Sequence, residues 1–144
     1  MTPRVQPARP EDFDAIAQLL GGHKLPLDGL RDHLATTMVA RDGERIVGSA
    51  ALEVYEDGAL LRSVAVARGL QHAGLGRVMV DAAIDLARAR EIPALYLLTT
   101  TAERYFPKFG FERIERGDVP SGVQQSVEFT SACPASAVVM RKTL

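Results

Sequence analysis

The segment from Leu60 to Arg90 constrains the fold of this chain most strongly, because three kinds of local structure follow one another in it. Leu60 to Val66 is an apolar run of strand length. A short turn with two glycines, Gly74 and Gly76, comes next, and the residues after it repeat their apolar positions at helical spacing. Backbone N–H groups converge where such a turn enters a helix, and the helix dipole adds roughly half a positive charge. The segment therefore predicts a site for a phosphate-bearing ligand.

The residues of the turn distinguish between three phosphate-binding patterns. A P-loop requires Gly-x-x-x-x-Gly-Lys-Ser/Thr, and no Lys-Ser/Thr pair follows these glycines. A dinucleotide-binding fingerprint requires Gly-x-Gly-x-x-Gly, and Met79 occupies the third glycine position. The third pattern is Gln/Arg-x-x-Gly-x-Gly/Ala, which Gln71, Gly74 and Gly76 match. It is the pyrophosphate loop of the GNAT superfamily of acyl-CoA-dependent N-acetyltransferases, and the segment resembles that loop.

The rest of the chain predicts a mixed α/β fold in one domain, residues 1–144. Asp42-Gly43 and Glu56-Asp57-Gly58 are hairpin signals, so the central strands are expected to form an antiparallel meander. The unit 60–99 is strand–helix–strand, which favours one parallel pair with a right-handed crossover. Strands are expected at 5–8, 37–41, 45–55, 59–66, 94–99, 111–115 and 137–142, and helices at 10–20, 27–34, 74–90, 102–109 and 123–129.

The helix expected at 74–90 has one apolar face along its length, with charged residues such as Arg77 and Asp81 opposite. We therefore expect it to lie on the sheet through that face. The apolar positions at helical spacing are Leu75, Val78, Met79, Ala82, Ala83, Leu86 and Ala87.

Three motifs in this element order resemble the GNAT superfamily over almost the whole chain. They are 62–66 with the following turn, the strand at 95–99, and 105–111, which is similar to the family's Phe-Tyr-x-Lys-x-Gly-Phe segment. The resemblance implies the GNAT fold, a mostly antiparallel mixed sheet with one parallel splay, flanked by helices. The C-terminal stretch 128–140 also resembles bacterial N-acetyltransferases that are associated with arsenic resistance.

The resemblance implies that acetyl-CoA is the cosubstrate and that no metal is needed. The backbone of the strand that ends the first motif would pair with the pantetheine arm, as an added strand does. The amides of the turn would hold the pyrophosphate, and the segment 102–109 would touch the far end of the cofactor. The cofactor-binding residues expected are Val64, Ala65, Val66, Gln71, His72, Ala73, Gly74, Leu75, Gly76, Arg77 and Phe106.

Amide formation from a thioester requires a neutral amine, whereas an alkyl amine with a pKa like that of lysine, about 10.4, is mostly protonated at neutral pH. A base must therefore remove a proton. The strand at 59–66 has no carboxylate, so we expect Glu53 on the preceding strand to be the catalytic base. The alternative for Glu53 is a solvated position on the face of that strand. The amide of Val64 is the oxyanion donor that the resemblance implies.

Two adjacent aromatic residues compete for the role of catalytic acid. The tyrosine that protonates the leaving thiolate in the family aligns with Phe106, and Tyr105 lies one residue earlier, about 100° away on a helix. Tyr105 acts as the acid if the segment is shifted by one residue. Otherwise it is a packed aromatic side chain and the enzyme works without an acid there, at a cost of roughly 10²–10⁴-fold in rate.

Two polar residues on the borders of the expected cleft are candidates for substrate binding. Arg62 is expected to bind a carboxylate or another anion, and its alternative is a surface ion pair. Thr99 ends the central strand, where ligand sites often lie, and its alternative is capping of the next helix. The single cysteine, Cys133, is expected to be structural, since capture of trivalent arsenic usually needs more than one thiolate.

Composition gives no basis for a nucleic-acid or membrane partner. The net charge is −1, basic residues are dispersed, and no apolar run approaches the ~18 residues of a membrane span. The N-terminus lacks an apolar signal core, so a cytoplasmic protein is expected, as a monomer or a homodimer.

The function expected is direct acetyl transfer, through a tetrahedral intermediate, to the primary amine of a small molecule such as an amino acid or an amino-acid-like toxin. A non-catalytic acyl-CoA sensor on the same fold and a protein N-terminal acetyltransferase are the alternatives.

Overall fold

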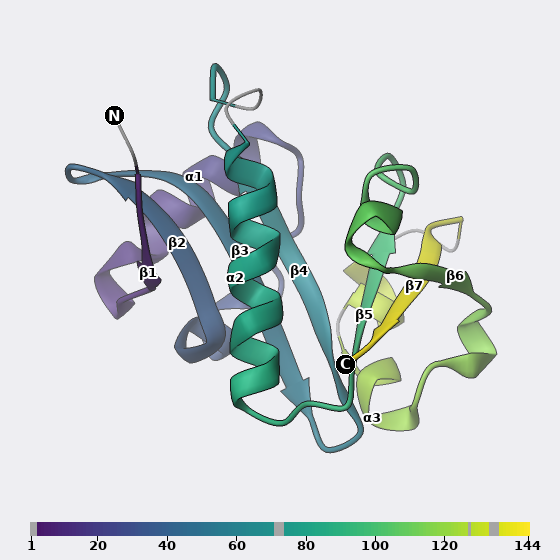
Figure 1. The fold of residues 1–144 in the computed structure, drawn as a ribbon. Coiled ribbons are helices and arrows are strands. Elements are labelled where there is room, and N and C mark those ends of the chain that lie inside the picture. Colours follow the sequence, from purple (N-terminus) through teal and green to yellow (C-terminus); the bar gives the residue numbers. More distant parts are fainter. Residues whose placement is uncertain (1–2, 71–73, 127, 133–135) are drawn as a thin grey trace.

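The computed structural model describes residues 3–70, 74–126, 128–132 and 136–144. Within these residues seven strands form one sheet in the order β1-β2-β3-β4-β5-β7-β6 (Figure 1). All neighbouring strands are antiparallel except β4 and β5, which are parallel, so the mixed sheet expected from the sequence is confirmed. The strands are β1 Arg4–Pro7, β2 Thr37–Asp42, β3 Arg45–Tyr55, β4 Gly58–Val66, β5 Ala94–Thr99, β6 Glu112–Ile114 and β7 Val138–Thr143.

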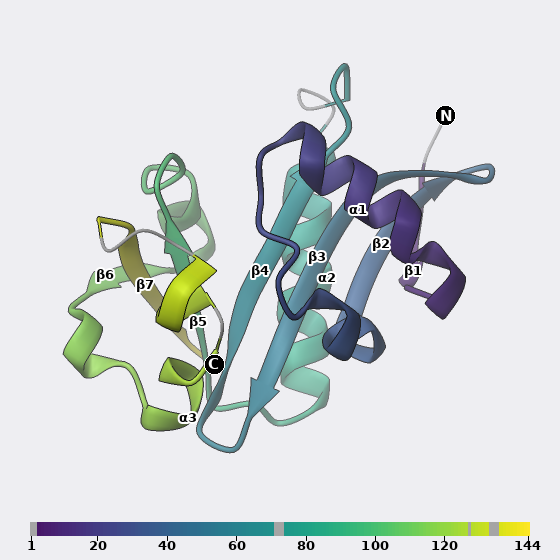
Figure 2. The same cartoon turned by 180° about the vertical axis from the view of Figure 1, so that it is seen from behind.

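Helices cover both faces of this sheet. The long helix α2 lies on one face and α1 on the other, as the two opposite views show (Figures 1 and 2). None of the described helices is long and apolar enough to cross a membrane. The α-helices are α1 Phe13–Gly22, α2 Leu75–Ala89 and α3 Ser121–Gln124; the 3₁₀ segments are η1 Pro10–Asp12, η2 Leu30–Thr36, η3 Phe106–Phe109 and η4 Arg116–Asp118; and η5 Glu128–Ala132 is a π-helical turn.

Three of the expected helices differ from the structure. The segment expected to be helical at 102–109 is a series of turns followed by the short η3. Pro107 lacks the N–H that would continue an α-helical ladder, and Gly110, at a φ of 92°, ends the segment. The helix expected at 27–34 is the 3₁₀ segment η2, and the one expected at 123–129 is reduced to the four residues of α3 followed by η5.

The buried face of α2 is rotated from the one that spacing suggested. Val78 is 45% exposed, whereas Val80 and Ile84 are buried against the sheet. The helix carries apolar residues around more than half of its circumference, so periodicity alone does not fix which stripe faces inward. Packing on β2, β3 and β4 decides this, and Met79 and Ala83 are fully buried.

The pairing of β4 with β5 is short, and the two strands diverge beyond it. The parallel ladder joins Ala59 to Leu95 and Leu60 to Tyr96. Both strands continue well beyond these pairs, β4 to Val66 and β5 to Thr99. The strands therefore diverge, while β7 pairs with β5 along its other edge and lies between β5 and β6.

Candidate functional site

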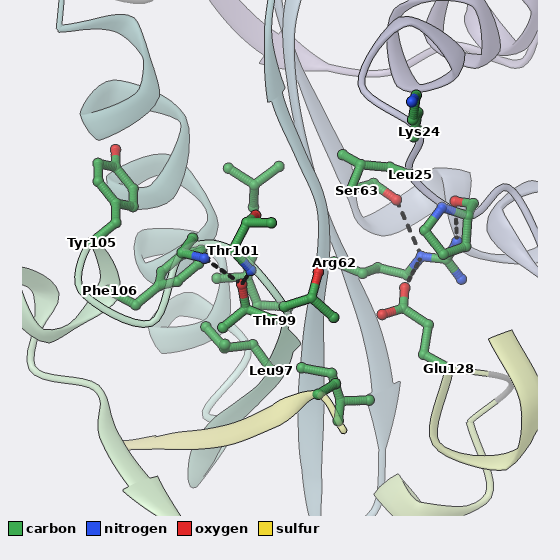
Figure 3. A pocket seen from close by; sticks show the side chains of 17 residues that line it. Lys24, Leu25, Arg62, Ser63, Leu97, Thr99, Thr101, Tyr105, Phe106 and Glu128 are labelled. Carbon is green, nitrogen blue, oxygen red and sulfur yellow. Dashed lines mark hydrogen bonds and ion pairs between the residues drawn. The ribbon is translucent and has the colours of Figure 1, made fainter. Parts of the chain in front are cut away.

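A cavity of about 460 Å³ occupies the splay between β4 and β5 (Figure 3). The two strands form its facing walls. The loop after α1 and the turn η5 contribute from one side, and the segment that leads into η3 contributes from the other. The lining residues are Lys24, Leu25, Pro26, Leu61, Arg62, Ser63, Val64, Leu97, Leu98, Thr99, Thr100, Thr101, Ala102, Tyr105, Phe106, Glu128 and Ala137.

A β-bulge in β4 lies on the wall of the cavity. Ala65 pairs with Ser49 and Arg62 pairs with Ala51, so two residues of β4, Ser63 and Val64, oppose a single residue of β3. Ser63 has a φ of 57°, a left-handed conformation that costs roughly 1–2 kcal/mol for a residue other than glycine. The Ser49 hydroxyl donates to the Ser63 carbonyl at 2.7 Å and supports this conformation. A bulge bends its strand locally, and both bulged residues line the cavity.

The residues expected to bind the cofactor through β4 differ in their surroundings. Val64 is half-buried and lines the cavity. Ala65 packs in the apolar cluster on the α1 side, and Val66 packs in the cluster on the α2 side. The ladder between β4 and β5 stops at Leu60, so the edge of β4 along the cavity is not paired with β5 there.

The glycine turn leads into α2 next to the cavity. Gln71, His72 and Ala73 lie outside the described residues. Gly74 precedes α2 with a φ of 78°, and no atom lies within 4 Å of where its Cβ would be. A Cβ on Gly76 would lie 2.9 Å from the Tyr105 hydroxyl. The first turn of α2 therefore meets the cavity at Tyr105, while its Leu75 is buried and its Arg77 is exposed.

Tyr105 and Phe106 form one end of the cavity. Their rings meet edge to face with centroids 5.3 Å apart, and Phe106 is buried against Phe111 while Tyr105 is half-buried. Burial raises the pKa of the Tyr105 phenol, and the nearby positive charge of Arg77 partly offsets this effect. The phenol is therefore protonated at neutral pH, as a proton donor must be.

Arg62 lines the cavity, but its guanidinium is engaged by protein groups. The side chain is fully buried. Its Nε donates to the Ser63 hydroxyl at 3.1 Å and lies 3.0 Å from the Glu128 carboxylate. Its Nη1 atom pairs with Glu53 at 2.6 Å. The remaining hydrogen bonds go to the carbonyls of Asp28 and Pro26. The guanidinium is thus part of a buried ion pair, which differs from the surface ion pair given as the alternative.

Glu53 lies behind this guanidinium and is not among the residues that line the cavity. Its carboxylate is almost fully buried, accepts a hydrogen bond from the Tyr55 hydroxyl at 2.5 Å and lies 3.6 Å from Nε2 of His33. Burial is the main cause that raises the pKa of Tyr55, and the hydrogen bond to Glu53 adds to it. The solvated position considered for Glu53 does not occur.

Thr99 lies at the cavity and also forms hydrogen bonds that stabilise the turn after β5. It lines the cavity, and its hydroxyl accepts hydrogen bonds from the backbone N–H groups of Ala102 at 2.9 Å and Thr101 at 3.4 Å. These bonds form the turn that leads to Tyr105. Among the described residues, no group of three or more histidine, cysteine, aspartate or glutamate side chains is placed to hold a metal ion.

Two charged residues of the cavity were not among the sequence candidates. Lys24 comes from the loop after α1, and Glu128 comes from η5 near the C-terminus. Glu128 belongs to the stretch 128–140, but the resemblance of that stretch gave this residue no role. Lys24 belongs to no recognisable local pattern, and each residue is far from β4 in the sequence. Only the tertiary structure brings them to the same cavity as Arg62.

Comparisons with known proteins identify the class to which this fold and cavity belong. The sequence model described as "Acetyltransferase (GNAT) family" matches residues 4–111. The amino-acid acetyltransferase of Mycobacterium tuberculosis is 30% identical over 131 residues, which cover 84% of this chain and 75% of that protein. An uncharacterized N-acetyltransferase of Chlorobaculum tepidum is 24% identical over 152 residues, which cover 97% and 96% of the two chains. The chain therefore belongs to the GNAT family of acetyltransferases.

Solved structures share the fold over the whole chain. The structure of Rv2747 from Mycobacterium tuberculosis, in complex with CoA and NLQ, has a TM-score of 0.82 at 26% identity and covers 99% of each chain. The N-acetylglutamate synthase of Neisseria gonorrhoeae, complexed with coenzyme A and N-acetyl-glutamate, has a TM-score of 0.84 at 21% identity. That match covers 100% of this chain and 35% of the synthase. The GNAT fold expected from the sequence is thereby confirmed.

Proposed function

We propose that this chain transfers the acetyl group of acetyl-CoA to the primary amine of a small amino acid or amino-acid-like compound. The observation that carries the proposal is the cavity between the diverging β4 and β5, which ends beside the first turn of α2. Two similar structures contain CoA, and one relative is named an amino-acid acetyltransferase.

The features of β4 and α2 fit an acyl-CoA ligand. The edge of β4 beyond Leu60 is not paired with β5, so its backbone groups can pair with a pantetheine arm at Val64, Ala65 and Val66. The open space at Gly74 leaves room for a pyrophosphate at the helix N-terminus. We assign the segment from Gln71 to Arg77 to this group, and Phe106 to the far end of the arm.

The reaction joins the amine nitrogen to the carbonyl carbon and breaks the carbon–sulfur bond. An ammonium and a thioester give an amide, a thiol and one released proton. In the proposed course the amine first loses a proton, and its nitrogen then attacks to form a tetrahedral oxyanion that the amide of Val64 stabilises. The leaving thiolate takes a proton from Tyr105, whose raised pKa keeps the phenol protonated. The cationic nitrogen of the intermediate loses its extra proton as the amide forms, and this proton replaces the one that Tyr105 gave. Glu53 does not line the cavity, so a proton reaches it only through an intervening group.

The C-terminal stretch 128–140 bears on the choice of acceptor, because it resembles acetyltransferases associated with arsenic resistance. We therefore include amino-acid-like compounds that carry arsenic among the proposed acceptors. Cys133 lies outside the described residues, so nothing in the structure supports a thiolate ligand for the arsenic.

Calorimetric titration with acetyl-CoA tests the cofactor half of the proposal. The wild-type chain is expected to bind, and the absence of binding at millimolar ligand would refute the proposed function. Gly74→Glu is expected to abolish binding because a side chain and a negative charge enter the phosphate site. Gly43→Glu is the matched control, since Gly43 also has a left-handed φ, of 63°, has no atom within 4 Å of its Cβ position and lies outside the cavity lining. Equal affinity in the two variants contradicts the loop assignment.

Thiol release from acetyl-CoA across the twenty L-amino acids, their arsenic-bearing analogues and short peptides tests the acceptor half. Turnover with amino acids is expected. Binding of acetyl-CoA with no turnover on any amine favours the sensor alternative, and turnover on peptides alone favours a protein acetyltransferase.

Replacement of Tyr105 tests the proton donor. Tyr105→Phe is expected to lower kcat by roughly 10²–10⁴-fold and to leave the KM for acetyl-CoA nearly unchanged. Tyr96→Phe is the control, because Tyr96 is buried outside the cavity lining. If kcat in Tyr105→Phe stays within about threefold of wild type, Tyr105 packs against Phe106 without transferring a proton.

A further inference from the structure

We propose that the carboxylate of Glu128, held in place by Arg62, binds the ammonium group of the acceptor. This inference rests on the proposed function and assigns to its acceptor half a residue from η5. Glu128 lines the same cavity as the bulge residues Ser63 and Val64, and only 5% of its surface is exposed. Figure 3 places Arg62 and Glu128 at one side of the cavity and Tyr105 and Phe106 at the other. An acceptor beside Glu128 therefore faces a thioester held between the two sides.

The charges of the buried cluster favour a cationic acceptor. Glu53, Arg62 and Glu128 together carry one net negative charge when both carboxylates are ionised and His33, 3.6 Å from Glu53, is neutral. A buried charge is costly unless an opposite charge compensates it, and the Arg62 guanidinium lies beside both carboxylates. Glu53 already accepts from the Tyr55 hydroxyl and pairs with Arg62 at 2.6 Å. Because Glu128 is the carboxylate that reaches the cavity wall, an ammonium group bound there would balance the charge.

Arg62 is a positioning residue in this arrangement rather than a ligand of the substrate. Its guanidinium donates to the carbonyls of Pro26 and Asp28, which fixes the loop that follows α1. Its Nε lies 3.0 Å from Glu128, which fixes η5 against β4. One side chain thus joins the two segments that enclose the acceptor end of the cavity. Both its charge and its hydrogen bonds are used by the protein, so a substrate anion would have to displace them.

A purely structural role for Glu128, in which it only anchors η5 to β4, makes a different prediction. Glu128→Gln keeps the size of the side chain and an oxygen that can accept from Arg62, and it removes the negative charge. If Glu128 is only an anchor, the variant changes stability and leaves acceptor affinity intact. If Glu128 binds the ammonium, the acceptor affinity falls while the affinity for CoA stays the same.

The experiment is a calorimetric titration of L-amino acids into the protein, both with saturating CoA, which carries no acetyl group, and without it. Glu128→Gln is expected to bind the acceptor about 10- to 100-fold more weakly than wild type, the loss typical of a charge-assisted hydrogen bond. Glu56→Gln is the control, because Glu56 is exposed and lies outside the cavity lining. It is expected to bind like the wild type.

A ligand comparison separates the ammonium from the rest of the acceptor. The same titrations are made with the carboxylic acid that lacks the amino group of the best amino acid. Removal of the ammonium from the ligand and removal of the charge from Glu128 each break the same contact. The two losses of binding free energy are therefore expected to overlap rather than add. Additive losses would overturn the inference.

Two further outcomes separate this inference from the proposed function. If wild type and Glu128→Gln bind the amino acid equally, or if no L-amino acid binds the wild type at millimolar concentration, Glu128 is not the ammonium ligand. CoA binding would stand in both cases. If the wild type does not bind CoA, the proposed function fails, while the titrations without CoA still test Glu128.

Discussion

Replacing Arg62 by methionine should be among the most damaging single substitutions in this chain. The side chain is fully buried and contacts the carboxylates of Glu53 and Glu128. Methionine fills a similar volume but supplies no charge and no donor. The variant therefore leaves two carboxylates buried without their shared cation, and the carbonyls of Pro26 and Asp28 lose their donor.

The size of the effect follows from the burial of the pair. Removing one partner of a buried ion pair typically costs about 3–5 kcal/mol, whereas an exposed pair contributes about 0–1 kcal/mol. For a chain of 144 residues, each 1 kcal/mol shifts the melting temperature by roughly 2–4 °C. We therefore expect Arg62→Met to lower the free energy of unfolding by about 3–5 kcal/mol and the melting temperature by about 6–20 °C.

Urea unfolding followed by circular dichroism at neutral pH measures this free energy directly. Arg62→Lys is the graded control, since one ammonium keeps the charge but cannot reach all of the acceptors that the guanidinium serves. The triple variant that adds Glu53→Gln and Glu128→Gln removes the uncompensated charges. It is expected to regain much of the lost stability.

Two results would refute this reasoning. A loss below about 1 kcal/mol in Arg62→Met would mean that the pair contributes no more than a surface ion pair does. A triple variant as unstable as Arg62→Met would mean that the cost comes from packing rather than from unpaired charge.

Two other contacts give independent predictions. Gly122→Ala is expected to lower the free energy of unfolding by about 1–2 kcal/mol, because its Cβ would collide with the Asp57 carboxylate that accepts the Gly122 N–H at 2.8 Å. Urea unfolding measures this loss, with Gly117→Ala as the control because a Cβ there meets no atom within 4 Å. Equal stability of the two variants would contradict the prediction. The Arg41 hydrogen bond lowers the pKa of Asp12, so this pair stabilises the fold above the unfolded pKa of about 3.9 and the contribution is lost as pH falls through the folded pKa. Melting temperatures across pH should therefore show wild type above Asp12→Asn at neutral pH and a gap that closes in acid, whereas a gap independent of pH would point to packing.

The central strands and the long helix could be predicted closely because local chemistry specifies them. The strands expected at 45–55 and 94–99 are β3 and β5, and the helix expected at 74–90 is α2. Asp42 ends β2 and Gly43 begins the turn to β3, where Gly43 has a φ of 63°, a conformation that glycine adopts easily. Each of these features depends on residues within one turn or one period of each other.

The short elements after β5 were predicted less well, and so were the partners of the charged residues. Short segments carry few repeats, so a helix at 102–109 and the turns observed there have nearly the same pattern. The sequence identified Arg62 and Glu53 as candidates of opposite charge but not as partners. Their contact depends on the register of β3 against β4, in which Glu53 pairs with Leu60 and Ala51 pairs with Arg62.

The sequence by itself determined the cofactor half of the proposed site, because a strand, a glycine turn and a helix N-terminus are contiguous in the chain and are formed by local backbone preferences. The tertiary structure alone decided the acceptor half. The cavity lies where the short β4–β5 ladder ends and the two strands diverge, and the fold brings Lys24 and Glu128 to it from distant parts of the chain. Contacts between residues so far apart in the sequence depend on how whole elements pack, and local periodicity does not predict this packing.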